Sequence, residues 1–397
     1  MWKMKQFLYD HRQFIEQLLL HWKELLLNAE FLQPLWIQTA LLRAIRFTGD
    51  MILIFRDFPI VKVHSIKTEH EQIIFIGQEV DEFIHIFFNH LKSYQLDSHT
   101  IWAWHIPKKT SEWLNNGADM VVCAVSRLFP WRAQSRFTTS TPKWISQVYP
   151  IPKNCNDPLP ENKAKTIRKT IERNPSLLNI KFTKELADFD LFYKRMYVPH
   201  VTFKHGSLVY VEPYEYLLKW FNRGGIIFTL KNDEPVAGVL VAFSGDVIHA
   251  YEVGILDGNI DLYKAGIIRI MDWLVAKWAC NQGYKLFQLG GTYSFRSNGV
   301  FQYKVGWYST VRDFFGFIRN EWRINLEKPS LELVTYLNKL GIIHENNRKY
   351  FSVFLQIEEA NDNNSIEKEL NLAIKDGLAG IRYISPNKQE YFSQTRI

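Results

Sequence analysis

The sequence predicts an α+β (α/β) fold in which mixed, mostly antiparallel sheets are flanked by helices. Short apolar strands alternate with segments of helical apolar spacing along most of the chain. Three strands at 226–230, 236–243 and 246–253 follow one another with turn sequences between them, which is typical of an antiparallel meander. The meander leads into a strand–helix–strand unit, which completes the α/β pattern.

The first half of the chain carries the pattern of one α/β unit. Apolar residues at helical spacing predict helices within 10–45 and at 80–94. The segments with strand-like composition are 51–55, 60–65, 72–76, 100–105 and 120–126. We therefore expect a first domain at residues 1–150.

A proline-dense polar segment at 149–160 separates the two halves and indicates a linker. A basic helix follows at 161–174. This helix either presents a solvated face between two domains or meets an anionic ligand or membrane, and its charge alone does not decide between them.

The second half predicts a domain at 151–325 and a small α/β appendage at 326–397. Before the meander we expect a strand at 178–182 and helices at 188–197 and 213–221. After it comes a helix with an apolar stripe from Ile267 to Trp278, capped by Asn259 or Asp261 and ended by Gly283. The remaining expected elements are strands at 284–289 and near 311–318, a helix at 331–340, a strand at 350–356, a helix at 366–375 and a strand at 380–384.

The bulk composition suits a folded, basic protein. The 397 residues are long for one core, and 47% hydrophobic with 15% aromatic residues exclude general disorder. The net charge of +7 favours anionic partners such as phosphates, CoA, nucleic acid or an acidic membrane face. A solvated basic surface is the plainer explanation of the same excess.

The three cysteines, Cys123, Cys155 and Cys280, lie far apart in the sequence. Their spacing argues against a zinc site or a disulfide framework and fits a reduced compartment. The sequence contains no run of about 20 apolar residues, so we expect no transmembrane helix. It also shows no secretory signal. We therefore expect a cytoplasmic protein.

The segment 286–307 is the most informative stretch. It begins as an apolar strand, breaks at Gly290-Gly291, crosses a polar loop containing Asn298, and continues with Tyr303 and Lys304 among aromatics. Glycines at a strand end let the backbone approach a ligand, and Lys304 can stabilise negative charge on an acyl donor or phosphate. A glycine-rich hairpin with a packed lysine is the structural alternative.

The turn that joins the meander to the next helix is a second candidate. It begins at Val253-Gly254 and ends with Lys264-Ala265-Gly266 at a helix start. Helix N-termini favour a pyrophosphate, although Gly266 would serve equally well for close helix packing.

Glu252 lies at the end of the preceding strand, where a carboxylate can accept a proton from an attacking amine. The alternative is a carboxylate at the strand edge facing solvent. Motifs for dinucleotide binding, P-loop hydrolysis, zinc proteolysis and serine hydrolysis are missing from the sequence, and no metal is expected.

Together these pieces resemble the GNAT acyltransferase superfamily, and in particular its FemAB-like branch. The resemblance is carried by the linker with its basic helix, by the Gly254–Gly266 turn, and by Leu289-Gly290 through Ser297-Asn298-Gly299-Val300-Phe301-Gln302-Tyr303-Lys304-Val305-Gly306-Trp307. It covers about residues 145–320 and implies tandem GNAT-like domains, the first of them degenerate. A related pattern often has Asp where this chain has Asn298, so no carboxylate role is carried over to that position.

The resemblance implies transfer of an acyl group, most simply acetyl, from acyl-CoA to an amine of an amino sugar, amino acid or peptide-like acceptor. It implies catalytic roles for Lys304, Glu252 and Tyr303. The donor would be bound by Val253, Gly254, Lys264, Ala265, Gly266, Gly290 and Asn298. An aminoacyl-tRNA-dependent peptidyltransferase and a non-catalytic GNAT scaffold are the alternatives. Cell-envelope or polysaccharide biosynthesis is the expected setting, with peripheral membrane contact permitted.

Overall fold

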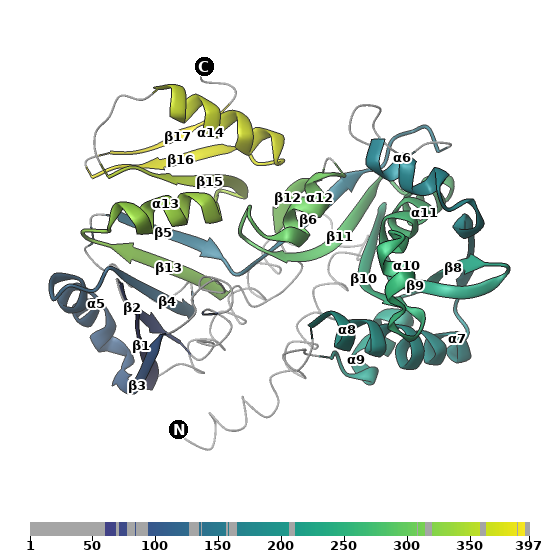
Figure 1. Cartoon of the computed structure of the whole chain (residues 1–397), viewed down its shortest axis with the longest axis horizontal. Coiled ribbons are helices and arrows are strands. Elements are labelled where there is room, and N and C mark those ends of the chain that lie inside the picture. The colour runs from purple at the N-terminus through teal and green to yellow at the C-terminus, as the bar shows by residue number, and fades with distance from the viewer. Residues whose placement is uncertain are drawn as a thin grey trace, which may run out of the picture. The chain divides into compact units, whose positions relative to one another are not determined.

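The computed structural model describes residues 60–68, 71–77, 84, 94–126, 135, 137–155, 158, 165–205, 211–307, 309–313, 320–357, 363–386 and 388–393. The described residues fall into two compact units. Unit 2 comprises those within 146–291 and 303–311, and unit 1 comprises the others. The helices and strands of both are drawn in Figure 1 and labelled there where space allows.

Unit 2 is built on a seven-stranded sheet with the order β12-β6-β11-β10-β9-β8-β7. Strands β7 to β10 pair antiparallel in succession, and β11 lies parallel to β10. The predicted meander and strand–helix–strand unit are therefore confirmed. The strands are β6 (Trp144–Pro150), β7 (Asn179–Thr183), β8 (Gly224–Lys231), β9 (Glu234–Ser244), β10 (Val247–Ile255), β11 (Leu286–Tyr293) and β12 (Thr310–Asp313).

Helix α11 (Ile267–Asn281) packs the largest apolar stripe of unit 2 onto this sheet. Ile270, Met271 and Leu274 are buried against β-strand residues that include Val239 and Phe287. This is the amphipathic pattern that the sequence predicts. Unit 2 also contains α6 (Lys165–Glu172), α7 (Leu186–Leu191), the π-helical turn η3 (Phe192–Tyr197), α8 (Val198–His205), α9 (Tyr214–Phe221) and α10 (Ile260–Lys264). Of α12 (Gly299–Val305), the residues from Tyr303 onward belong to unit 2.

Two details of this region differ from expectation. Asn259 caps the short helix α10 rather than the long helix, because Gly266 adopts a left-handed conformation and starts α11 separately. Residues 299–305, where we expected loop and packed aromatic sequence, form the helix α12.

Unit 1 contains a six-stranded sheet with the order β3-β1-β2-β4-β13-β5 and a four-stranded sheet with the order β14-β15-β16-β17. Strand β2 runs parallel to β4, and α5 (Ile106–Asn115) precedes β4 in the chain, so unit 1 also has a parallel pair in a mixed sheet. Both units thus confirm the predicted fold class. The strands of the larger sheet are β1 (Ile60–Lys67), β2 (Gln72–Ile76), β3 (Gln95–Trp102), β4 (Met120–Ser126), β5 (Phe137–Pro142) and β13 (Asn320–Leu326).

The C-terminal residues belong to the same unit as the N-terminal strands. Strand β13 pairs with β4 on one side and β5 on the other, and one core joins Phe75 and Trp322 to Leu337 and Val353. The compact units therefore do not follow the ranges 1–150, 151–325 and 326–397 that we expected. The C-terminal elements are α13 (Leu331–Leu340), β14 (Ile343–Asn346), β15 (Lys349–Leu355), α14 (Asn363–Lys375), β16 (Gly380–Ile384) and β17 (Gln389–Phe392).

The expected helix within 10–45 and the strand at 51–55 lie outside the described residues, as does nearly all of the expected helix at 80–94. Within the described ranges, no helix is long and apolar enough to cross a membrane.

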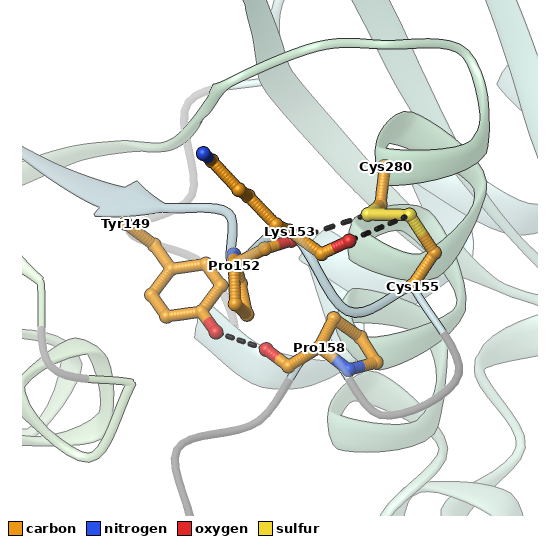
Figure 2. Close-up of a disulfide and its surroundings, with 6 residues drawn as sticks. All are labelled: Tyr149, Pro152, Lys153, Cys155, Pro158 and Cys280. Atoms are coloured by element: carbon orange, nitrogen blue, oxygen red, sulfur yellow. Dashed lines mark hydrogen bonds between the residues drawn. A yellow bond between two sulfur atoms is a disulfide. The ribbon is translucent and has the colours of Figure 1, made fainter.

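The cysteine spacing, which we expected to argue against a disulfide framework, does not exclude a single disulfide. Cys155 and Cys280 are disulfide-bonded (Figure 2). Their Cα atoms are 5.4 Å apart, and Cys123 is free and buried. The sequence separation of 125 residues hides this proximity, because the segment after β6 returns to the C-terminal end of α11.

Candidate functional site

The parallel strands β10 and β11 pair over only part of their length. Their register runs from Val247↔Leu286 to His249↔Gln288, and both strands continue well beyond the last pair. Parallel neighbours normally share evenly spaced hydrogen bonds along the ladder. The separation of β10 from β11 therefore leaves backbone groups of both strands to bind something other than each other.

A β-bulge lies on β10 at this separation. The register of β10 with β9 shifts between Ala250 and Glu252, which leaves Tyr251 as the extra residue. Bulges redirect side chains and are frequent next to active sites. Tyr251 stacks on Trp220 with ring centroids 4.1 Å apart, so the bulged position is held by packing.

Glu252, the residue after the bulge, is half-buried. Burial raises the pKa of Tyr197 above its ordinary range, and the nearby charge of Glu252 adds to that shift. The Tyr197 hydroxyl accepts a hydrogen bond of 2.9 Å from the backbone N–H of Glu212. The buried phenol of Tyr197 is thus within electrostatic range of the Glu252 carboxylate.

Lys304 reaches back from α12 to the point where β11 leaves β10. Its Nζ donates hydrogen bonds of 2.9 Å to the carbonyl of Gly290 and 2.7 Å to that of Gly291. Gly290 has φ +75°, and a Cβ there would lie 3.2 Å from the Ala250 carbonyl. Only glycine adopts that conformation readily, so the Gly-Gly break and the lysine act together to shape the end of β11.

Tyr303 is engaged with a residue that sequence reasoning missed. Its hydroxyl donates a hydrogen bond of 2.6 Å to Asp272 on α11. Burial raises the pKa of Asp272 to about 6, against the lowering effects of this hydrogen bond and of the Lys304 charge. Burial and the Asp272 charge in turn raise the pKa of Tyr303. An aspartate within the apolar stripe of a predicted helix was the available signal.

The glycines of the 254–266 turn are each in close contact with a helix of unit 2. A Cβ on Gly254 would lie 2.6 Å from the backbone of Met196 and Tyr197. A Cβ on Gly266 would lie 2.8 Å from Cγ2 of Thr170 on α6. These contacts favour the packing explanation that the sequence left open for Gly266.

The rest of that turn is placed as follows. Val253 is half-buried near the end of β10, and Lys264 is exposed on the last turn of α10. The carbonyl of Ala265 accepts a hydrogen bond of 3.4 Å from Asn174. The first turn of α11 follows directly, with its N-terminal dipole end beside the exposed cations Lys264 and Arg269.

Asn298 has a structural position at the start of α12. Its Oδ1 accepts hydrogen bonds from the backbone N–H of Val300 (2.9 Å) and Phe301 (3.2 Å), and one from the Thr292 hydroxyl (3.2 Å). This is N-cap geometry, for which Asn and Asp are both favoured. The departure from Asp is thus explained by capping without a carboxylate.

Comparison with known proteins finds a family that matches part of the chain. Residues 161–305 match the family described as acetyltransferase (GNAT) domain. No curated protein matches the chain.

Solved structures are similar at low identity. The chain is similar to L-PGS from Bacillus licheniformis, with 11% identity over 72% of this chain and 86% of that one and a TM-score of 0.34. It is similar to FemX, with 9% identity over 70% and 90% and a TM-score of 0.31. It is also similar to a GCN5-related N-acetyltransferase from Sphaerobacter thermophilus, with 10% identity over 66% of this chain and 75% of that one and a TM-score of 0.28. The assignment rests on the family match and not on these likenesses.

Residues 161–305 contain the meander and the parallel pair that separates. Their match to the acetyltransferase (GNAT) domain supports an acyltransferase.

Proposed function

We propose that unit 2 transfers an acyl group, most simply acetyl, from acyl-CoA to the amine of an amino sugar, amino acid or peptide-like acceptor. The observation that carries this proposal is the separation of β10 from β11 at the bulge on Tyr251, within a GNAT domain. An extended donor with amide groups can pair with backbone groups that the ladder no longer uses. Binding of this kind positions the reactive carbonyl beside the acceptor, which is a large part of the rate gain.

The chemistry is acyl transfer without a covalent enzyme intermediate. The acceptor nitrogen forms a bond to the thioester carbonyl carbon, the carbon–sulfur bond breaks, and CoA leaves as the thiolate. Glu252 is the proposed base for the amine proton. Lys304 is a proposed positioning residue, since its Nζ holds the Gly290 and Gly291 carbonyls.

The donor phosphates would lie at the start of α11. Lys264 and Arg269 are exposed there, and helix N-termini favour phosphate oxygens. The net charge of +7 supports an anionic donor without distinguishing CoA from tRNA. A cytoplasmic location and a role in cell-envelope or polysaccharide biosynthesis remain part of the proposal, the former because acyl-CoA is an intracellular donor.

Calorimetric titration of the full chain with acetyl-CoA, CoA and aminoacyl-tRNA tests the proposal. We expect saturable binding of acetyl-CoA, weakened in Lys264→Met. Asp246→Asn, which changes an exposed charge in the β9–β10 turn, is the matched control. Binding of aminoacyl-tRNA without any CoA thioester would favour the peptidyltransferase alternative, and binding of neither would favour a non-catalytic scaffold.

A further inference from the structure

The segment that follows β6 is tied to the rest of unit 2 at several points. The Cys155–Cys280 disulfide joins it to the C-terminal turn of α11, and Cys280 Sγ lies 3.2 Å from the Pro152 carbonyl oxygen. The Tyr149 hydroxyl donates a hydrogen bond to the carbonyl of Pro158 (Figure 2). The backbone N–H of Ile151 donates one of 2.8 Å to the carbonyl of Lys285. Of these ties, the disulfide is the one that a chemical reaction can open and close.

The N-terminal end of α11 contacts α6, which is the first helix after the segment that follows β6. Helix α6 packs on α11, with its Thr170 against Gly266. Asn174, which follows α6, donates a hydrogen bond to the carbonyl of Ala265. Cys155 precedes the first residue of α6 by only ten positions. The disulfide at the C-terminal end of α11 therefore restrains the chain just before α6, and α6 in turn packs at the N-terminal end of α11.

A second connection leads from the tied segment toward Lys304. Tyr149, which is buried, packs edge-on against the Trp307 ring with centroids 5.8 Å apart. The backbone N–H of Trp307 donates a hydrogen bond of 2.9 Å to the carbonyl of Lys304. Loss of order in the tied segment would thus weaken the packing of the helix that carries Lys304.

We propose that Cys155–Cys280 is a redox-controlled brace, opened by a dithiol and closed by a disulfide oxidant. A thiolate of the dithiol attacks one sulfur, giving a mixed disulfide. Its second thiol then displaces the protein, so that the dithiol is oxidised to its disulfide and Cys155 and Cys280 become thiols. Both cysteines are only half-buried, which leaves the bond within reach of such a reagent. In a reducing compartment, disulfides of this kind are more often regulatory than permanent.

Opening the brace is expected to loosen α6 from the start of α11. A disulfide that closes a loop of more than 100 residues contributes enough stability to shift Tm by roughly 5–15 °C when it is lost. The loosening should be local, so that hydrogen exchange increases in α6 and the first turn of α11 before it increases in β8 and β9.

The test uses the full chain oxidised with oxidised glutathione and then reduced with dithiothreitol. Thiol labelling after denaturation should find one thiol, on Cys123, in the oxidised protein and three in the reduced protein. Reduction should lower Tm and raise exchange in α6. The double variant Cys155→Ser with Cys280→Ser should match the reduced protein and ignore dithiothreitol. Cys123→Ser, with its disulfide intact, is the matched control and should respond as the parent does.

Three results would overturn the proposal. The first is failure of the oxidised protein to lose two thiols. The second is a fall in Tm on reduction that also occurs in the double variant. The third is a fall in Tm without faster exchange in α6, which would make the disulfide a static crosslink. This test needs no substrate, so its outcome is independent of the proposed acyl transfer.

Discussion

The phenol of Tyr303 donates a 2.6 Å hydrogen bond to the carboxylate of Asp272, which joins α12 to the buried face of α11. The next residue along α12 is Lys304, whose ammonium holds the carbonyls of Gly290 and Gly291. A buried carboxylate on the preceding helix is thus part of the support for the end of β11. Its titration is open to direct measurement.

Asp272→Asn should change how stability depends on pH. Because burial raises the pKa of Asp272 to about 6, the folded protein keeps a proton between about pH 4 and 6 that the unfolded chain has released. Stability from this group therefore falls as pH rises through that window, by about 3 kcal/mol in total. Denaturant unfolding of Asp272→Asn should lack this fall.

The comparison must be made between parent and variant. Burial and the charge of Arg382 together lower the pKa of His344 in unit 1 to about 4. Stability from His344 therefore rises with pH in the same range, opposite to the effect of Asp272. Parallel curves for parent and Asp272→Asn from pH 4 to 7 would contradict the assignment.

Lys304→Met should reduce both stability and transfer. It keeps most of the aliphatic packing but leaves two carbonyls at the end of β11 without their donor, at a cost of about 1–3 kcal/mol. We expect lower kcat from the altered strand end. Lys264→Met, at an exposed position, should raise KM for the donor and leave stability unchanged. If both variants change only KM, and by the same amount, Lys304 does not position the catalytic strand end.

Glu252→Gln should slow transfer without weakening the binding of acetyl-CoA. Loss of a general base typically costs a factor of about 10² to 10⁴. The loss should shrink at higher pH, where more of the acceptor amine is already deprotonated. A rate equal to that of the parent at neutral pH would return Glu252 to the role of a strand carboxylate.

Arg296→Met should destabilise unit 1 strongly. Its guanidinium is buried and bonds to Asp376 at 2.8 Å, to Ser352 at 3.1 Å and to Glu369. Removing one partner of a buried ion pair costs about 3–5 kcal/mol. Arg195→Met breaks an exposed pair with Asp257 and should leave the thermal unfolding of the protein unchanged. Similar effects of the two substitutions would contradict this distinction.

Local periodicity was enough to predict much of the fold. The expected helix at 331–340 and strand at 380–384 coincide with α13 and β16, because each has its own apolar pattern and end signals. Local patterns could not predict the disulfide or the position of β13 between β4 and β5. Both features bring together residues that are distant in the chain.

The site shows the same division. The Gly290 break and Lys304 stood out as residues, but the bond between them depends on α12 folding back. The hydrogen bond between Tyr303 and Asp272 could not be predicted, because no local pattern around Asp272 indicates a partner on another helix. Contacts across the sheet are set by tertiary packing, which short-range patterns do not encode.

Gly266→Ala separates packing from ligand binding at the start of α11. The position has φ +85°, and the new Cβ would lie 2.8 Å from Cγ2 of Thr170, so both backbone strain and a clash are expected. Gly245→Ala, at φ +56° with no atom within 4 Å, has only the strain and should cost about 1 kcal/mol. Gly266→Ala should cost more. Adding Thr170→Ser, which deletes the clashing methyl, should recover the excess in a double-mutant cycle measured by denaturant unfolding. If Thr170→Ser recovers nothing while acetyl-CoA binding is lost, Gly266 serves the donor and not α6.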